Sequence, residues 1–254
     1  MSPTFRERLS SNELLIGTLV TLAAPEVTEI LTGAGFDWLW IDLEHAPLGP
    51  YAAQALLQAA AGRTACVLRV PLNDEIWIKK ALDIGANGII VPMVNTAEAA
   101  RRAVVLSKYP PQGSRSVGVA RAQGYGANLA AYLRTANQQT AVIVQAEHIQ
   151  AVENIDAILE VDGIDAVMVG PYDLSASMGL IGQVEHPRVQ EAIQRVRQAC
   201  QARGKPLGVF VASVERAQAY IQEGFHLVAT GVDTMLLAQA AGTIVDRLRQ
   251  PNVS

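Results

Sequence analysis

The segment WLWIDLEHAP, residues Trp38–Pro47, carries an apolar run directly into three titratable side chains, Asp42, Glu44 and His45. Histidine changes its charge near neutral pH, and it acts as a general base when a carboxylate holds one tautomer and raises its basicity. Asp42 is close in sequence, and Asp83 can come from the helix packed beyond the next strand. A structural histidine is the commoner occurrence, so the segment alone leaves both roles of His45 open.

Carboxylates also follow two later apolar runs. Glu147 ends TAVIVQAE, with Gln145 two residues before it, and Asp173 comes shortly after the Gly-Pro dipeptide that follows IDAVMV. Their oxygens suit a hard divalent ion such as Mg2+ or Mn2+, with water and a chelating substrate completing the shell. The alternatives are that Glu147 is a solvated residue and that Asp173 is the N-cap of the segment LSASMG.

Two arginine-bearing segments complete the candidate chemistry. Arg69 in VLRVP is either an ion-pair partner at the rim of the fold or a clamp for an anion or oxyanion. The Gly-rich segment 110–128 carries Arg115 and Arg121, and an irregular segment of this length in a compact domain is usually functional or mobile. A surface loop with two stray arginines is the competing interpretation.

Strand-like apolar runs alternate with amphipathic stretches along the whole chain, and this alternation must position those residues. Each run is followed by a helical pattern, the last of which covers residues 235–250. Eight such units in this length predict a (β/α)8 barrel, whose active site lies at the carboxyl ends of the strands. A doubly wound sheet competes, but no GxGxxG follows the first run. The predicted strands are residues 14–22, 36–43, 65–70, 88–94, 140–147, 164–170, 206–212 and 226–232.

Composition limits the class of protein. The chain has 254 residues, 50% hydrophobic and 17% charged, which predicts one globular domain over residues 1–254. The net charge of -4, without a cluster of Lys and Arg, argues against nucleic acid as a partner. A polar N-terminus and the lack of an apolar run of about 18 residues predict no signal peptide, no membrane span and a cytoplasmic location. Cys66 and Cys200 are expected to be reduced, buried thiols.

The motifs together resemble the HpcH/HpaI aldolase family of metal-dependent pyruvate aldolases. The resemblance covers nearly the whole chain, in family order and spacing. The segments that carry it are DWLWIDLEHAP, LRVP, ALDIGANGIIVPMV, VQAEHIQAVENIDAI and GIDAVMVGPYDLSASMGL. The resemblance implies a (β/α)8 barrel that uses a divalent metal (Mg2+, Mn2+ or Co2+), with a small oxo acid and an aldehyde as substrates. It also implies a homo-oligomer, commonly a hexamer, in which neighbouring copies exchange the C-terminal helix.

The resemblance also implies roles for individual residues. His45 would be the catalytic base, Asp83 its partner in a dyad, and Arg69 the stabiliser of the transition state. Glu147 and Asp173 would hold the metal. The pyruvate part would be held by Gln145, the backbone around Tyr172, and Asp173. Asp42 and Glu44 would contact these site residues without binding the substrate or the metal themselves.

The implied reaction is the reversible cleavage of 4-hydroxy-2-oxo acids to pyruvate and an aldehyde. Schiff-base chemistry would need a lysine of lowered pKa inside the barrel, whereas Lys79 and Lys80 fall in a helix, Lys108 ends another, and Lys205 precedes a strand at the opposite rim. Two further alternatives are an acyl-CoA lyase of the citrate lyase β-subunit type, which would want more basic residues, and a barrel that binds an oxo acid without turning it over.

Three positions depart from the family pattern. His148 follows the metal-binding Glu where Thr is usual, Ser116 replaces a Gly in the loop, and Tyr172 stands where a small residue is common. Tyr172 is expected to line the pocket beside Asp173 and to narrow the range of aldehydes. These departures leave the identity of the physiological substrate open.

Overall fold

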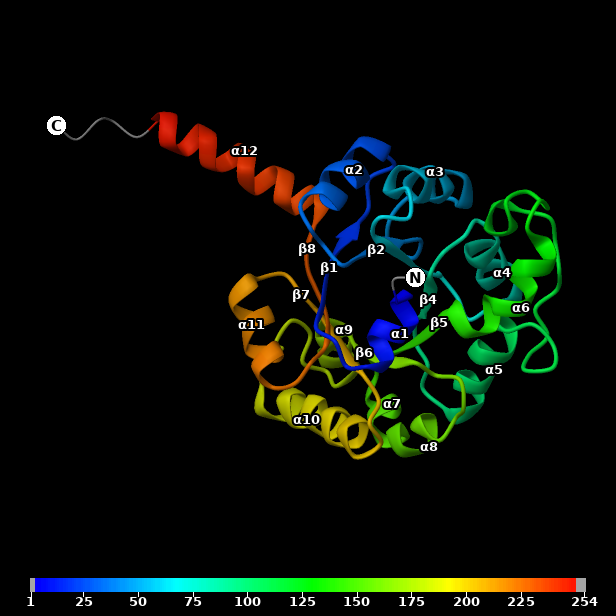
Figure 1. Ribbon diagram of the computed structural model, residues 1–254. Helices are drawn as coiled ribbons and strands as arrows, with labels where there is room; N and C mark the ends of the chain where they lie inside the picture. The colour runs from blue at the N-terminus through cyan, green and yellow to red at the C-terminus, as the bar shows by residue number, and fades with distance from the viewer. Residues whose placement is uncertain (1–2, 250–254) are drawn as a thin grey trace.

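Eight parallel strands close into a barrel in chain order, which confirms the predicted (β/α)8 fold (Figure 1). The computed structural model describes residues 3–249, so residues 1–2 and 250–254 of the predicted domain lie outside the described residues. β1 (Leu15–Val20) pairs with β8 (Leu227–Val232) to close the barrel. The strands between them are β2 (Trp38–Asp42), β3 (Ala65–Arg69), β4 (Gly88–Val91), β5 (Ala141–Ala146), β6 (Ala166–Val169) and β7 (Leu207–Val211).

Helices cover the outside of the barrel, because each strand is buried on both faces and needs an apolar layer against it. The helices that follow β1 to β4 are α2 (Pro25–Gly33), α3 (Pro50–Ala60), α4 (Glu75–Asp83) and α5 (Ala97–Ser107). The later part of the chain adds η1 (Arg121–Gln123), α6 (Leu129–Gln139), α7 (Ile149–Glu153), α8 (Ile155–Leu159), α9 (Pro171–Ser177), α10 (Pro187–Ala202), α11 (Val214–Gln222) and α12 (Asp233–Arg249). α1 (Phe5–Ser10) precedes the barrel.

Large side chains fill the barrel interior, so it is a packed core. The rings of Trp38 and Trp40 stack with centroids 6.0 Å apart and are almost completely buried. Gly17 on β1 is required beside them, because a Cβ there would lie 2.5 Å from the indole of Trp38. Aliphatic residues form the second core, between the strands and the helices. Both predicted thiols, Cys66 and Cys200, are free and buried.

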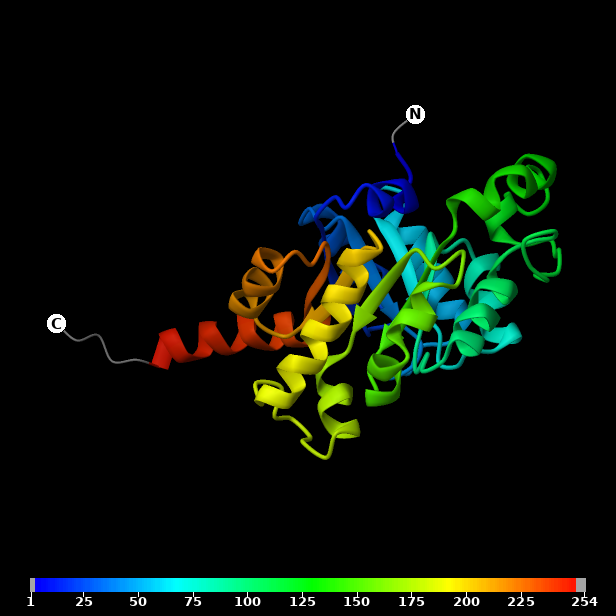
Figure 2. The same cartoon turned by 90° about the horizontal axis from the view of Figure 1, so that it is seen from below.

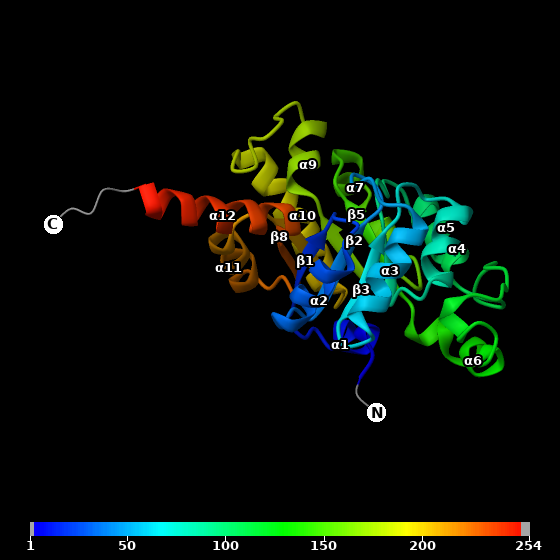
Figure 3. The same cartoon turned by 90° about the horizontal axis from the view of Figure 1, so that it is seen from above.

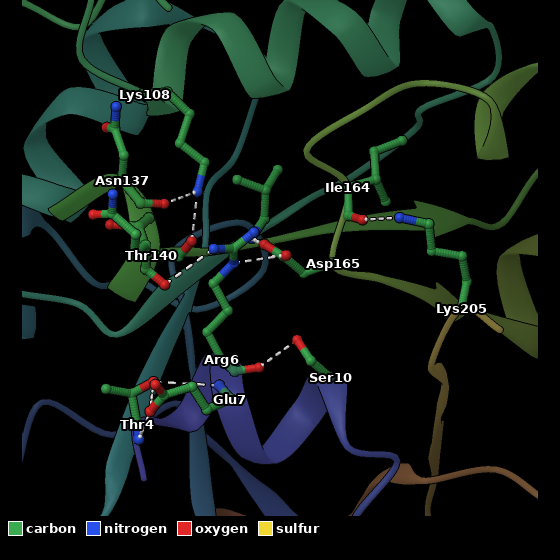
Figure 4. A network of polar contacts seen from close by, with 12 residues as sticks. Thr4, Arg6, Glu7, Ser10, Lys108, Asn137, Thr140, Ile164, Asp165 and Lys205 are labelled. Atoms are coloured by element: carbon green, nitrogen blue, oxygen red, sulfur yellow. Dashed lines mark hydrogen bonds and ion pairs between the residues drawn. The ribbon is translucent and has the colours of Figure 1, made fainter. Parts of the chain in front are cut away.

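The amino ends of the strands are covered by α1, which is attached by polar contacts (Figure 4). Arg6 donates from Nε to Asp165 Oδ1 at 2.7 Å. Nearby, the Lys108 ammonium donates to the backbone carbonyls of Asn137 and Thr140, at 2.9 and 2.7 Å. Burial lowers the pKa of Lys108 to about 8, but its place among these carbonyls is at the end of the barrel away from the candidate site. A lowered pKa therefore does not make Lys108 a Schiff-base lysine.

α12 extends away from the barrel in all three views (Figures 1, 2 and 3). Its first residue, Asp233, is buried and accepts hydrogen bonds from the backbone N–H groups of Thr21 and Leu22. Beyond Asp233 the helix is exposed, including Leu237, Ile244 and other apolar side chains. Over residues 3–249, none of the helices combines the length and the hydrophobicity that a membrane span requires.

Candidate active site

A cavity of about 290 Å3 opens at the carboxyl ends of the strands. Trp40 forms part of its wall together with Phe210, a residue that the sequence analysis did not single out. The cavity brings together side chains from β2, β3, β5 and the segment after β6, as predicted from their positions at strand ends. The predicted site residues that line it are Asp42, His45, Arg69, Gln145, Tyr172 and Asp173.

A buried ion pair joins β2 to β3 at the rim of this cavity. Arg69 donates from Nε to Asp42 Oδ1 at 2.9 Å and from Nη2 to Oδ2 at 2.7 Å. Burial would raise the pKa of Asp42, but the hydrogen bonds and charge of Arg69 outweigh it, and the pKa is lowered. The guanidinium also lies over the ring of Trp40, 5.1 Å from the centroid. Arg69 is thus an ion-pair partner that also faces the cavity, so the two proposed roles are compatible.

The carboxylate next to the His45 imidazole is that of Glu44. Glu44 Oε2 lies 3.7 Å from His45 Nε2 and 3.2 Å from Arg69 Nη1. Asp42 contacts His45 only through the backbone, by accepting its N–H at 3.4 Å. Burial, with Asp42 and Asp173 nearby, raises the pKa of Glu44 against the opposing effect of Arg69. The His45 side chain is 67% exposed, so it can reach a substrate in the cavity.

Within one chain, Asp83 is not brought to His45. Asp83 is the last residue of α4, and α4 runs antiparallel to the strands, so its end lies near the amino ends of the strands. Figure 3 shows the two ends of the barrel, with α1 and α6 near one end and α9 near the other. The Asp83 carboxylate instead accepts a hydrogen bond from Arg115 Nη2 at 2.6 Å. A dyad of Asp83 with His45 therefore requires two copies of the chain.

The two arginines of the Gly-rich segment have structural partners and are not stray surface charges. The Arg115 side chain is fully buried and lies over the ring of Tyr109, 4.5 Å from its centroid. Arg121 donates to the backbone carbonyls of Ile84 and Leu57, near the ends of α4 and α3. Together they fasten the segment to the outer helices.

Glu147 is buried just beyond the end of β5, which excludes the interpretation of a solvated residue. Its exposed fraction is 4%. Oε1 accepts the Met93 backbone N–H at 2.7 Å, and Oε2 accepts from Gln145 Nε2 at 2.8 Å. Burial raises the pKa of Glu147 to about 7, and the negative charges of Glu44 and Asp173 add to this. A carboxyl group with such a raised pKa lies in an environment that disfavours its negative charge unless a cation is near.

Two backbone features that the sequence analysis missed shape this carboxylate site. Met93 has a φ of 53°, a left-handed conformation uncommon for a residue with a side chain, and its N–H points at Glu147. Gly170 follows β6, and a Cβ there would lie 3.1 Å from Glu147 Oε2. The Gly-Pro dipeptide after the strand was the available signal for Gly170, whereas nothing in VPMV indicated a positive φ.

Asp173 lies in the first turn of α9 and is exposed. It is neither at the end of β6, where it was predicted, nor the N-cap, because the chain turns into α9 at Pro171 and Gly170 takes the cap position. The same turn places Tyr172 on the cavity wall, as expected.

The other two residues that depart from the family pattern lie outside the cavity lining. His148 is the N-cap of α7 and accepts the Gln150 N–H. Ser116 is exposed on the Gly-rich segment.

The raised pKa of Glu147 leads to a prediction for the metal-free protein. A group whose pKa is higher in the folded state, here about 7 against 4.5, contributes stability at low pH that is lost as the pH rises through the folded pKa. With EDTA present, the free energy of unfolding should fall by up to about 3 kcal/mol between about pH 5 and pH 8. Urea unfolding across this range measures it. In Glu147→Gln the fall should be much smaller, and parallel curves for the two proteins would contradict the assignment.

Comparisons with known proteins agree with this architecture. The family model described as HpcH/HpaI aldolase/citrate lyase matches residues 15–240. The proteins named 4-hydroxy-2-oxo-heptane-1,7-dioate aldolase from Salmonella dublin and Salmonella typhimurium are each 43% identical to the chain over 249 residues, covering 97% of it and 95% of the relative. A crystal structure of a HpcH/HpaI aldolase/citrate lyase family protein from Burkholderia cenocepacia has a TM-score of 0.93 and 35% identity, covering 96% of this chain and 98% of that one.

A more distant structure shares the fold alone. The citrate lyase β subunit from Mycobacterium tuberculosis, solved with oxaloacetate and magnesium, has a TM-score of 0.63 and 15% identity, and the alignment covers 90% of this chain and 95% of that one. The much higher identity to the Salmonella proteins favours aldolase chemistry over the acyl-CoA lyase alternative.

Proposed function

The chain belongs to the HpcH/HpaI aldolase/citrate lyase family and is a carbon-carbon lyase, and we propose that it reversibly cleaves 4-hydroxy-2-oxo acids to pyruvate and an aldehyde with a divalent metal ion. The observation that carries the proposal is a buried carboxylate of raised pKa, Glu147, held against Gln145 of the cavity wall, together with the buried Arg69 on the same wall. Carboxylates suit a metal ion, and the arginine suits an oxyanion.

The residues present fit a divalent ion. Glu147 and Asp173 offer carboxylate oxygens, and Gln145 Oε1 is buried without a hydrogen-bond partner in the described part of the chain. Gly170 leaves open the space that a Cβ would take beside Glu147. Among residues 3–249, no group of three or more His, Cys, Asp or Glu side chains is arranged to hold a metal. Two carboxylates and an amide oxygen are donors that suit Mg2+, Mn2+ or Co2+, ions that keep water and substrate oxygens in their shell.

A divalent ion at this site supplies a Lewis acid that offsets negative charge developing on the substrate. The protein side chains supply the rest. His45 takes the proton from the C4 hydroxyl, the C3–C4 bond breaks, and the electron pair passes to the oxo group as the aldehyde leaves. Arg69, already held in place by Asp42, stabilises the resulting enolate charge without having to reorganise. Protonation at C3 then yields pyruvate.

A screen of 4-hydroxy-2-oxo acids with detection of pyruvate tests this function. We expect release of pyruvate and an aldehyde from at least one compound in the presence of Mg2+, Mn2+ or Co2+. Borohydride in the presence of pyruvate should trap no adduct on a lysine. Binding of oxo acids without turnover of any compound would favour the alternative of a non-catalytic barrel, and turnover of a citramalyl or malyl thioester alone would favour the acyl-CoA lyase.

We further propose that the chain forms a homo-oligomer, a hexamer as in the family resemblance, in which α12 packs on a neighbouring copy. Leu237, Ile244 and Leu248 repeat at helical spacing and are 65%, 60% and 81% exposed. In proteins most of the stability of a helix comes from packing of its apolar face, and the apolar face of this 17-residue helix is exposed beyond Asp233. Ile244→Glu with Leu248→Glu should therefore lower the mass measured by light scattering, whereas Gln239→Glu on the same helix should not. A monomeric wild-type protein would contradict the proposal.

The same assembly is the arrangement in which Asp83 can serve His45. A mixture of His45→Ala and Asp83→Asn chains, denatured and refolded together, should regain part of the activity that neither variant has alone. Each mixed oligomer would then contain sites with both native residues. If the mixture stays as inactive as its components although both variants fold and exchange, Asp83 acts only by holding Arg115.

A further inference from the structure

A second cavity, of about 270 Å3, adjoins the active-site cavity. Pro171, Tyr172 and Phe210 line both cavities, so these residues form a shared wall. The second cavity lies between the chain after β6 and the start of α11. Asp173, the proposed metal ligand, directly follows Tyr172 in the chain, so a long substrate bound at Asp173 could reach the second cavity past the rings of Tyr172 and Phe210.

The polar groups of this second cavity form a charge pair. Arg216, in the first turn of α11, lies with Nη2 2.5 Å from Glu185 Oε1. Its guanidinium also lies over the ring of Tyr220, 5.4 Å from the centroid. Neither side chain is buried, with 40% of Arg216 and 62% of Glu185 exposed. The pair is therefore held at the cavity wall while its remaining donors and acceptors stay open to a ligand.

The charge balance of the pair selects among possible ligands. A guanidinium carries five N–H groups, and a carboxylate can accept several hydrogen bonds. A hydroxyl both donates and accepts, so a chain of hydroxyls can bind Glu185 and Arg216 together without separating them. A carboxylate ligand would be repelled by Glu185 and would have to displace it.

We propose that this second cavity is the subsite for the distal end of the aldehyde, and that Arg216 and Glu185 select an uncharged, polyhydroxylated chain. The inference rests on the proposed aldol reaction and adds the substrate class to it. The Salmonella relatives are named for a dicarboxylate, so the chain would differ from them in the aldehyde that it prefers.

The test compares three four-carbon aldehydes, erythrose, succinic semialdehyde and butanal, as acceptors for pyruvate in the holoenzyme with Mg2+ or Mn2+. For the wild-type protein, kcat/KM should be highest with erythrose. Arg216→Leu and Glu185→Gln should each lower kcat/KM for erythrose about tenfold or more, mainly through KM, because a site built for hydroxyl groups loses its partner. Butanal should change less than about twofold, since it makes no polar contact with the pair.

Two controls separate the possible outcomes. Arg101→Leu removes an exposed arginine on α5, outside both cavities, and should alter no ratio. Arg216→Lys keeps the charge and should recover part of the preference for erythrose. Unchanged ratios in both Arg216→Leu and Glu185→Gln would overturn the subsite. If the wild-type protein prefers succinic semialdehyde and Arg216→Leu abolishes that preference, the proposal of a polyhydroxylated aldehyde is overturned. A failure to turn over any aldehyde, butanal included, would refute the aldol function itself.

Discussion

Chelation with EDTA is expected to abolish aldol cleavage, and Glu147→Gln to lower kcat at least about a thousandfold. The loss of a Lewis acid that offsets enolate charge removes several kcal/mol of barrier lowering, which corresponds to that factor. Glu147 is the buried carboxylate of the pair, and its pKa of about 7 shows how strongly the site disfavours an uncompensated negative charge. Steady-state pyruvate release with and without added divalent ion measures the effect.

A matched control for this variant is Glu153→Gln, which changes an exposed glutamate on α7 in the same way. It should keep wild-type activity and the same response to Mg2+, Mn2+ or Co2+. Calorimetric titration of the ion into both variants should show binding to Glu153→Gln alone. Full activity of the wild-type protein after exhaustive chelation would refute the metal-dependent mechanism.

Arg69→Ala should lower kcat at least about a hundredfold and also destabilise the fold by about 3–5 kcal/mol. The two effects have separate causes, because the guanidinium faces the cavity and also neutralises Asp42, which is 1% exposed. His45→Ala should give a comparable loss of activity with little change in stability, since its side chain is 67% exposed. Kinetics combined with urea unfolding of both variants distinguishes the two effects.

The double variant Asp42→Asn with Arg69→Ala serves as the control for stability. It removes the unpaired buried charge, so part of the lost free energy of unfolding should return while activity stays low. Arg69→Lys keeps the charge but loses the paired hydrogen bonds to Asp42, and it should fall between wild type and Arg69→Ala. Near wild-type kcat in a folded His45→Ala protein would move the role of base to Glu44, the carboxylate next to His45.

The eight-unit alternation was sufficient to predict the barrel, because strands buried on both faces must be continuous apolar runs, and such runs are visible in sequence. The same reasoning placed Asp42, His45, Arg69 and Gln145 around one cavity, since the carboxyl ends of all strands meet on one face of a closed barrel. These positions follow from strand ends alone. The family resemblance added roles, and the comparisons confirm the family.

Only the tertiary structure decided how those groups pair. Asp42 is close to His45 in sequence, yet its carboxylate binds Arg69 of the next strand. The parallel register of β2 and β3 places Asp42 and Arg69 side by side. Asp83 ends α4, on the side of the barrel away from His45, and its carboxylate accepts a hydrogen bond from Arg115. No local sequence pattern indicates this partner, because Arg115 lies 32 residues further along the chain.

The sequence by itself determined the barrel, the face that carries the chemistry and the kinds of groups found there, because these depend on local periodicity and on residue type. The three-dimensional packing decided the pKa of Glu147, the left-handed turn at Met93 and the second cavity beside Tyr172. Each of these depends on burial and on distances between segments far apart in the chain. Burial and distance are products of the packed fold, so single-sequence periodicity contains no direct signal for them.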